Sequence, residues 1–115
     1  MTSEAMENLI QRQADSYNSR DLDTFCACYH PEVEVYRNVG EPASVKGISD
    51  FRKSYKERFE SSPGLHCAIK SRIVLSKTVV DEELVTGLAG SSAPLHVVAV
   101  YSFRDGLISH VWFAR

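Results

Sequence analysis

The order of hydrophobic patterns along the chain restricts its fold more than any other feature of the sequence. In the first half, apolar residues recur at helical spacing, whereas the second half alternates with a period of two and is rich in β-branched and aromatic residues. Helices are predicted over residues 3–18, 22–30 and 48–60, and strands over residues 33–37, 65–75, 78–89, 95–104 and 107–114. Helices followed by antiparallel strands predict an α+β fold, with the helices packed on one face of a curved sheet.

The length and composition indicate one folded domain. The chain has 115 residues, 43% of them hydrophobic and 24% charged, so we expect a single domain over residues 1–115. A net charge of -2 with interspersed acids and bases argues against a surface that binds nucleic acid or a membrane. No apolar run approaches the roughly 20 residues that span a bilayer. The start of the chain lacks signal-peptide features, and three cysteines form no disulfide framework, so we expect a reduced, cytoplasmic setting.

The last two predicted strands are apolar on both faces. Residues 95–104 place Val97 and Tyr101 on one face and Val98 and Val100 on the other. A sheet that is covered on one face only should be polar on the opposite face. Because the helices can cover only one face, we expect a second subunit to cover the other, and we predict a homodimer. The residues expected at this interface are Val98, Val100, His110 and Trp112.

Two short motifs carry a resemblance to a known family. Residues 18–25 read N-x-x-D-L-D-x-F, and residues 103–108 read F-R-D-G-x-I. With the order of the predicted elements, they make the chain similar, over nearly its whole length, to the nuclear transport factor 2-like superfamily. The most similar branch holds the small proteins described as SnoaL-like or steroid-delta-isomerase-like. The resemblance implies a cone-shaped α+β barrel, in which three N-terminal helices pack on a strongly curved antiparallel sheet around a pocket, and a frequent homodimer through the outer sheet face.

The same resemblance tests for steroid isomerase activity. These isomerases need a tyrosine donor on the first helix, a carboxylate base on the first long strand and a protonated acid on a later strand. The aligned positions of this chain hold Gln13, Arg37 and Ala99. An arginine cannot act as the base, because its pKa is about 12 or higher. We therefore expect no ketosteroid isomerase activity.

Gln13 and Arg37 would offer an amide and a fixed cation to a ligand if both face the pocket, which suits a carboxylate, a phosphate or an enolate-like oxygen. Alternatively, Arg37 reaches solvent and pairs with Glu34 or Glu41. Aromatic residues on the helices and strands could line the pocket or simply fill the core. The candidate pocket-lining residues are Gln13, Tyr17, Arg37, Tyr55, Phe59, His66, Ala99, Tyr101, Val111 and Phe113.

Other titratable residues have a structural explanation beside a functional one. On a strand, Asp81 and Glu83 share one face while Glu82 points the other way. A buried carboxylate there would have a raised pKa and could act as an acid or a base, but the cluster of three acids favours a solvated hairpin or edge. His66 could lie at the pocket mouth, whereas His96 and His110 have the parity of the outer face. Cys26 and His30 could share a metal at helical spacing, but no four-ligand set appears, so we predict no metal site.

The turn of the last hairpin decides which aromatic side chains face inward. A two-residue turn at positions 105–106 pairs Arg104 with Leu107, whereas a three-residue loop with a bulge at Gly106 pairs Phe103 with Leu107. This slip of one residue exchanges the two faces of the last strand. The family pattern favours the bulge, which places Val111 and Phe113 inside and Trp112 outside.

The sequence thus predicts a protein with one pocket for a small apolar molecule or one that carries a carbonyl or acid group, with no cofactor. The resemblance leaves two functions open. One is a binding protein without turnover; the missing isomerase residues favour this function or an altered reaction. The alternative is a cofactor-independent isomerase, cyclase or dehydratase that uses general acid–base chemistry. A carboxylate or histidine within hydrogen-bond reach of an aromatic hydroxyl in the pocket would favour the enzyme.

Overall fold

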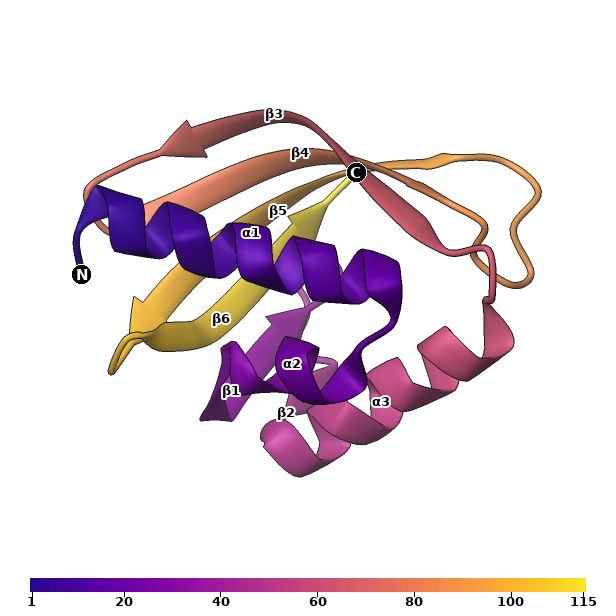
Figure 1. The fold of residues 1–115 in the computed structure, drawn as a ribbon, viewed down its shortest axis with the longest axis horizontal. Helices are drawn as coiled ribbons and strands as arrows, with labels where there is room; N and C mark the ends of the chain where they lie inside the picture. Colours follow the sequence, from indigo (N-terminus) through magenta and orange to yellow (C-terminus); the bar gives the residue numbers. More distant parts are fainter.

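Three helices cover one face of a single six-stranded sheet in the computed structural model, which describes residues 1–115 (Figure 1). The helices are α1 (Ser3–Ser19), α2 (Leu22–Ala27) and α3 (Ile48–Ser61). The strands are β1 (Tyr29–Tyr36), β2 (Val45–Lys46), β3 (His66–Val74), β4 (Thr78–Thr86), β5 (Leu95–Arg104) and β6 (Leu107–Ala114). In Figure 1, β3, β4 and β5 arch over α1, while α2 and α3 lie below α1, next to β1 and β2. The predicted α+β class is confirmed.

Helix α1 has a capping residue at each end. The Thr2 hydroxyl accepts a hydrogen bond from the Ala5 backbone N–H at 3.0 Å, which satisfies one of the free donors of the first turn. At the other end, Arg20 adopts a left-handed conformation with φ 56°, and its N–H bonds to the last carbonyls of the helix. The residues that α1 buries against the sheet recur at helical spacing: Met6, Leu9, Ile10, Gln13 and Tyr17.

Helix α2 is shorter than its sequence pattern suggests. The helix was predicted over residues 22–30, up to Pro31, but it ends at Ala27, and β1 begins at Tyr29. Tyr29 already pairs with Ile108 of β6, and the register of this pair of strands then shifts before Glu34. Pro31 lies in the shifted segment, where its missing N–H costs no ladder hydrogen bond.

The sheet is mixed rather than wholly antiparallel, which corrects one part of the predicted fold. The strand order is β2-β1-β6-β5-β4-β3, and every neighbouring pair is antiparallel except β1 and β6, which run parallel. The chain between β1 and β6 includes α3 and four further strands. It is therefore long enough to place β6 beside β1 in either direction. Strands β2 and β3 form the two edges of an open sheet, and β2 lies in a segment predicted as a loop.

The last hairpin combines features of both turn alternatives. Asp105 and Gly106 have φ values of 54° and 76° and form a two-residue turn that pairs Arg104 with Leu107. The register then shifts next to Ser102, because Ser109 is an extra residue on β6. The predicted bulge at Gly106 is therefore displaced to Ser109, and it restores the parity that was expected. Val111 is buried and Phe113 half-buried on the inner face, whereas Trp112 is 38% exposed.

An aromatic cluster fills the space between the helices and the start of β1. Phe25 of α2 is 1% exposed, and its ring centroid lies 4.8 to 5.8 Å from five other rings. These rings belong to Tyr17, Tyr29, Phe51, Tyr55 and Phe59. Such tilted and edge-on pairs stabilise a core beyond the area that they bury. The cluster fixes α2 and α3 against α1 and forms one wall of the cavity described below.

The outer face of the sheet is partly apolar. Trp112 stacks between Tyr36 and His110, with ring centroids 5.7 and 5.3 Å away, and Val98 and Val100 beside it are half-buried.

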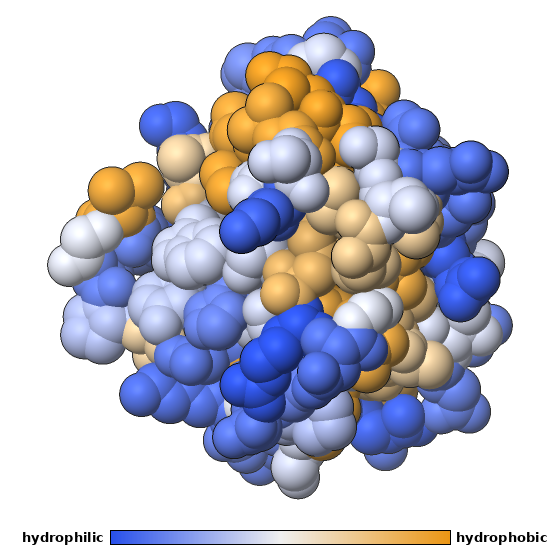
Figure 2. Space-filling view, turned by 90° about the vertical axis from the view of Figure 1, so that its left-hand side faces the viewer, coloured by the Kyte–Doolittle hydropathy of each residue, from blue (hydrophilic) through white to orange (hydrophobic).

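A second apolar area lies at the β3–β4 turn, where Ile73 and Leu75 are more than half exposed. Figure 2 views the end of the molecule that carries this turn, and an apolar area lies at its top. None of the helices is both long and apolar enough for a bilayer.

Candidate functional site

A cavity of about 170 Å³ lies between the helices and the inner face of the sheet. It is lined mainly by apolar side chains, with a small number of polar groups among them, which is the usual composition of a small-molecule site. Six of the sequence-predicted residues line it: Gln13, Tyr17, Arg37, Tyr55, Tyr101 and Phe113.

The other four predicted residues lie elsewhere. Phe59 and Val111 are buried in the core behind the cavity wall. Ala99 is fully buried on the inner face of β5, where it faces Asp81 and Phe113 on the neighbouring strands, and it does not reach the cavity. His66 is exposed at the start of β3. Parity alone could not separate these residues from the lining, because a core wall and a cavity wall share one face of the sheet.

Glu83 is the acidic group of the cavity, and the expectation of a solvated acidic cluster is wrong for it. Strand β4 lies between β3 and β5, so the face shared by Asp81 and Glu83 is covered by α1. Glu83 is 5% exposed and Asp81 is fully buried, whereas Glu82 points outward and pairs with His96 at 2.7 Å. The alternation of the strand was visible in the sequence, but the place of β4 between β3 and β5 and under α1 was not.

A chain of hydrogen bonds connects Glu83 to helix α1. The Tyr101 hydroxyl donates to Glu83 Oε2 at 3.2 Å, and Gln13 Nε2 donates to the Tyr101 oxygen at 3.3 Å. The Tyr29 hydroxyl in turn donates to Gln13 Oε1 at 2.8 Å. All four side chains are at least nine-tenths buried. Each bond polarises the next in this apolar surrounding, and every donor in the chain is directed toward the Glu83 carboxylate.

Burial gives these groups unusual acidities. It raises the pKa of Glu83 to about 7, and the negative charge of Asp81 contributes to the rise. Burial also holds the pKa values of Tyr29 and Tyr101 well above 10 and raises that of Tyr17 to about 12. At neutral pH the tyrosines therefore remain neutral donors, while Glu83 is present in both protonation states.

A buried ion pair lies next to Glu83. The Arg72 guanidinium holds both oxygens of Asp81, at 2.6 and 2.9 Å, and its Nη1 donates to Gln11 of α1 at 3.0 Å. This bidentate pairing satisfies both oxygens of the buried carboxylate. After burial, the negative charge of Asp81 is the next largest cause of the raised pKa of Glu83, whereas the positive charge of Arg72 lowers that pKa.

Three arginines line the cavity away from this chain. Arg37 follows the end of β1, Arg58 lies on α3 and Arg115 ends the chain. Arg37 does not pair with Glu34 or Glu41; its guanidinium lies 5.7 Å from the ring centroid of Tyr55 and 5.5 Å from that of Phe113. Arg58 lies 5.4 Å from the same Tyr55 ring and donates to the Tyr17 hydroxyl at 3.4 Å. The sequence analysis missed Arg58, although its spacing from Tyr55 places both on one helix face.

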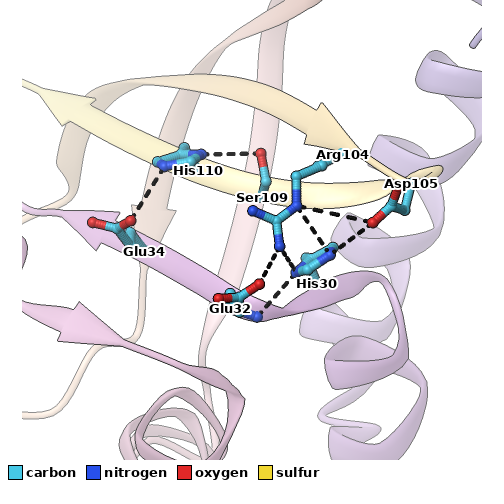
Figure 3. Close-up of polar contacts among 7 residues, drawn as sticks. All are labelled: His30, Glu32, Glu34, Arg104, Asp105, Ser109 and His110. Atoms are coloured by element: carbon cyan, nitrogen blue, oxygen red, sulfur yellow. Dashed lines mark hydrogen bonds and ion pairs between the residues drawn. The ribbon is translucent and has the colours of Figure 1, made fainter.

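The histidines lie outside the cavity. His96 and His110 are on the outer face, where His110 pairs with Glu34 at 3.4 Å. In Figure 3, His30 joins the start of β1 to the β5–β6 turn: it accepts from the Glu32 N–H at 3.0 Å and contacts Asp105 at 3.2 Å. Arg104 bridges His30 and Glu32 in the same cluster. None of these residues lines the cavity, so the cluster secures the strand to the turn.

The helical spacing that could have let Cys26 and His30 share a metal does not occur in the structure. Cys26 is on α2 and His30 is on β1, so the two are not one helical turn apart. The structure contains no group of three or more histidine, cysteine, aspartate or glutamate side chains placed to hold a metal ion. The three cysteines are buried and unpaired, and burial raises the pKa of the Cys67 thiol, which lines the cavity beside Glu83.

Comparison with known proteins gives the family. Residues 10–111 match the SnoaL-like domain, and no curated protein matches significantly. An uncharacterized cystatin-fold protein from Novosphingobium aromaticivorans is similar over 100% of this chain and 99% of its own, with a TM-score of 0.87 and 26% identity.

Two further solved structures share the fold at lower identity. A candidate ketosteroid isomerase from Kribbella flavida has a TM-score of 0.82 and 18% identity, with 96% of this chain and 76% of its own covered. A candidate SnoaL-like polyketide cyclase from Jannaschia sp. CCS1 has a TM-score of 0.80 and 17% identity, over 96% and 85%. The matched segment spans nearly all of the helices and the sheet described above, and the chain therefore belongs to the SnoaL-like domain family, with a nuclear transport factor 2-like fold.

Proposed function

We propose that the cavity is the active site of an enzyme that transfers protons on a small, largely apolar carbonyl compound, in the isomerase, cyclase or dehydratase class. The observation that carries this proposal is the contact between Glu83 Oε2 and the Tyr101 hydroxyl, at 3.2 Å inside an apolar cavity. A buried carboxylate within reach of an aromatic hydroxyl is the feature that distinguishes acid–base catalysis from simple binding.

Glu83 is the proposed acid and base. A group with a pKa of about 7 holds a proton half of the time at neutral pH, so it can accept one from a carbon next to a carbonyl and return it at another atom. The reaction then needs no net gain or loss of protons. In the same chain of hydrogen bonds, Tyr101 keeps the carboxylate oriented, because its hydroxyl donates to Glu83 Oε2.

The enolate oxygen formed in such a reaction needs neutral donors. The second hydrogen of Gln13 Nε2 is not used in any hydrogen bond within the protein, and the Tyr17 hydroxyl also lines the cavity. Because the pKa of Tyr17 is raised to about 12, it stays protonated and can donate. Donors that are fixed before the reaction stabilise a developing negative charge without reorganisation. Gln13 would thus supply, with a different side chain, the donor that isomerases take from a tyrosine.

The cavity does not favour a steroid substrate. An engineered protein cavity of about 150 Å³ binds benzene, so a volume of about 170 Å³ suits a body the size of one ring. The resemblance also aligns Arg37 with the carboxylate base of the steroid isomerases, and Ala99, aligned with their acidic donor, does not line the cavity. We expect no turnover of a Δ5-3-ketosteroid; robust turnover would contradict this assignment of the site.

Proton exchange provides a test that does not require the natural substrate. Small cyclic ketones such as cyclohexanone and 1-indanone would be incubated with the protein in D₂O, and loss of their α-proton signals would be followed by NMR. We expect exchange above the buffer rate, a rate that rises with an apparent pKa of about 7, and a loss of about 100-fold or more in Glu83→Gln. Glu82→Gln changes the same charge on the opposite face of β4 and should leave the rate unchanged. Equal rates in Glu83→Gln and the unaltered protein would refute the proposal.

Binding without turnover is the second candidate function. The side chains at Gln13, Arg37 and Ala99, in place of the isomerase residues, favour it. Saturable binding of the same ketones without any proton exchange would select this function over the enzyme.

We also propose that the protein forms a homodimer through the outer sheet face. The support is the stacked row of Tyr36, Trp112 and His110, which leaves an indole ring 38% exposed beside Val98 and Val100. Sedimentation at micromolar concentration should give a dimer, and Trp112→Lys should give a monomer. A monomeric unaltered protein would contradict this part of the proposal.

A further inference from the structure

The charge of the cavity is opposite to that of the whole protein. The chain has a net charge of -2, yet three of the residues lining the cavity are arginines and only one, Glu83, is an acid. Glu83 is 5% exposed, whereas Arg37 and Arg58 are half-buried and Arg115 is exposed. The cavity therefore has a deep end with a titratable carboxyl and a mouth with fixed positive charge.

None of the three arginines forms an ion pair. The arginines that do pair with acids, Arg52, Arg72 and Arg104, are all outside the cavity. Arg58 has five N–H donors, but its single hydrogen bond within the protein is the 3.4 Å contact with the Tyr17 hydroxyl. No buried side-chain nitrogen or oxygen lacks a hydrogen-bond partner, so the unused donors of Arg58 are accessible to solvent, and a ligand in the cavity can reach them.

Stacking accounts for only part of this arrangement. Arg37 and Arg58 both lie against the Tyr55 ring, at 5.7 and 5.4 Å from its centroid, and Arg37 also lies 5.5 Å from the Phe113 ring. Contact between a guanidinium and an aromatic ring is favourable, but it leaves the N–H groups free. A stacked guanidinium is held in place with its donor fork available, which is the geometry that binds a carboxylate through two parallel hydrogen bonds.

We propose that Arg37 and Arg58, held against Tyr55, form a carboxylate-binding subsite at the mouth of the cavity, so that the ligand is a small apolar acid. This inference rests on the proposed function in using the same cavity. It adds that the acid group stays at the mouth while the ring-sized body enters toward Glu83 and Tyr101. A carboxylate at the mouth would also orient the substrate, so that one end only of the molecule reaches Glu83.

The test compares a carboxylate with its neutral amide. Binding of 3-phenylpropanoate and 3-phenylpropanamide would be measured by calorimetry at about pH 8 and low ionic strength. We expect the carboxylate to bind about tenfold more tightly or better, and added salt to reduce the difference. Arg58→Gln and Arg37→Gln should each remove most of this preference. Arg58→Lys should retain part of it, because the charge remains while the donor fork is lost. Arg12→Gln, which removes an exposed arginine of α1 outside the cavity, is the matched control and should retain all of it.

The outcomes separate this subsite from the catalytic proposal. Equal affinity for the two probes, binding of neither at millimolar concentration, or a preference that survives in the Arg37→Gln/Arg58→Gln double variant would overturn the subsite. Glu83→Gln should keep the carboxylate preference, because Glu83 lies at the other end of the cavity. If proton exchange is absent while the preference is present and sensitive to Arg58, the enzyme proposal fails and the subsite stands.

Discussion

Replacing Glu83 by glutamine is expected to make the protein more stable at neutral and alkaline pH, although it removes the proposed catalytic group. Glu83 has a folded-state pKa of about 7, against an ordinary value of 4.5. Below about pH 4.5 the side chain is protonated in both folded and unfolded states. Between 4.5 and 7 the folded state binds more protons, so stability falls as the pH rises, and above 7 the loss is complete. Glutamine stays neutral throughout and avoids this loss.

The size of the effect follows from the shift in pKa. Each unit corresponds to about 1.4 kcal/mol, so a rise from 4.5 to about 7 gives about 3 kcal/mol at full ionisation. Part of this loss is already present at pH 5. The advantage of Glu83→Gln over the unaltered protein should therefore grow by about 2–3 kcal/mol between pH 5 and pH 8.

Urea unfolding of both proteins across this pH range measures the change directly. Comparing the two proteins cancels the titration of all other groups. Glu82→Gln is the control: the hydrogen bond from His96 lowers the pKa of Glu82, so this variant should gain nothing as the pH rises. A difference between Glu83→Gln and the unaltered protein that stays constant from pH 5 to pH 8 would refute the raised pKa, and with it the role of Glu83 as a base poised near neutrality.

Two further perturbations test the surroundings of the site. Asp81→Asn should lower the pKa of Glu83, because it removes the neighbouring negative charge and leaves the positive charge of Arg72. NMR titration of the Glu83 carboxyl resonance should then give a lower midpoint. An unchanged midpoint would contradict this prediction. The same variant should lose about 3–5 kcal/mol of stability, since it breaks a buried ion pair. Gly87→Ala should be strongly destabilising in thermal unfolding, because its Cβ would lie 2.0 Å from the Gly64 carbonyl oxygen where β4 meets the turn after α3. Gly90→Ala is matched to it, with a similar φ of 80° and open space around it, and should cost only about 1 kcal/mol; equal losses in both would contradict the role of close approach.

Much of the fold follows from patterns that are local in the sequence. Alternation over residues 95–104 and 107–114 predicts β5 and β6 with their observed bounds, since strand periodicity depends only on neighbouring residues. The helical stripe of α1 likewise places Gln13 and Tyr17 on the buried face. Local patterns did not show that β1 pairs in parallel with β6, because this pairing joins residues 76 to 79 positions apart.

The last hairpin shows how a correct outcome can arise by another route. The turn residues Asp105 and Gly106 form a two-residue turn, and the extra residue is Ser109 instead. Both arrangements place Val111 and Phe113 inside, because either one shifts the parity of β6 once. Where the extra residue sits depends on how β6 fits between β5 and β1, which the turn residues do not encode.

Residue identities and their spacing already specify the secondary structure around the cavity. They show which helix face is buried, which strands alternate, and that Asp81 and Glu83 share one side of β4. The tertiary structure decided their chemistry. Glu83 became a titrating group near neutrality only because β4 lies between two strands under α1, which removes water from it and brings the charge of Asp81 close. Arg58 became part of a site only because α3 brings it, with Tyr55, to the cavity that Arg37 also lines. Desolvation and convergence depend on contacts between distant segments, and these exist only in the folded chain.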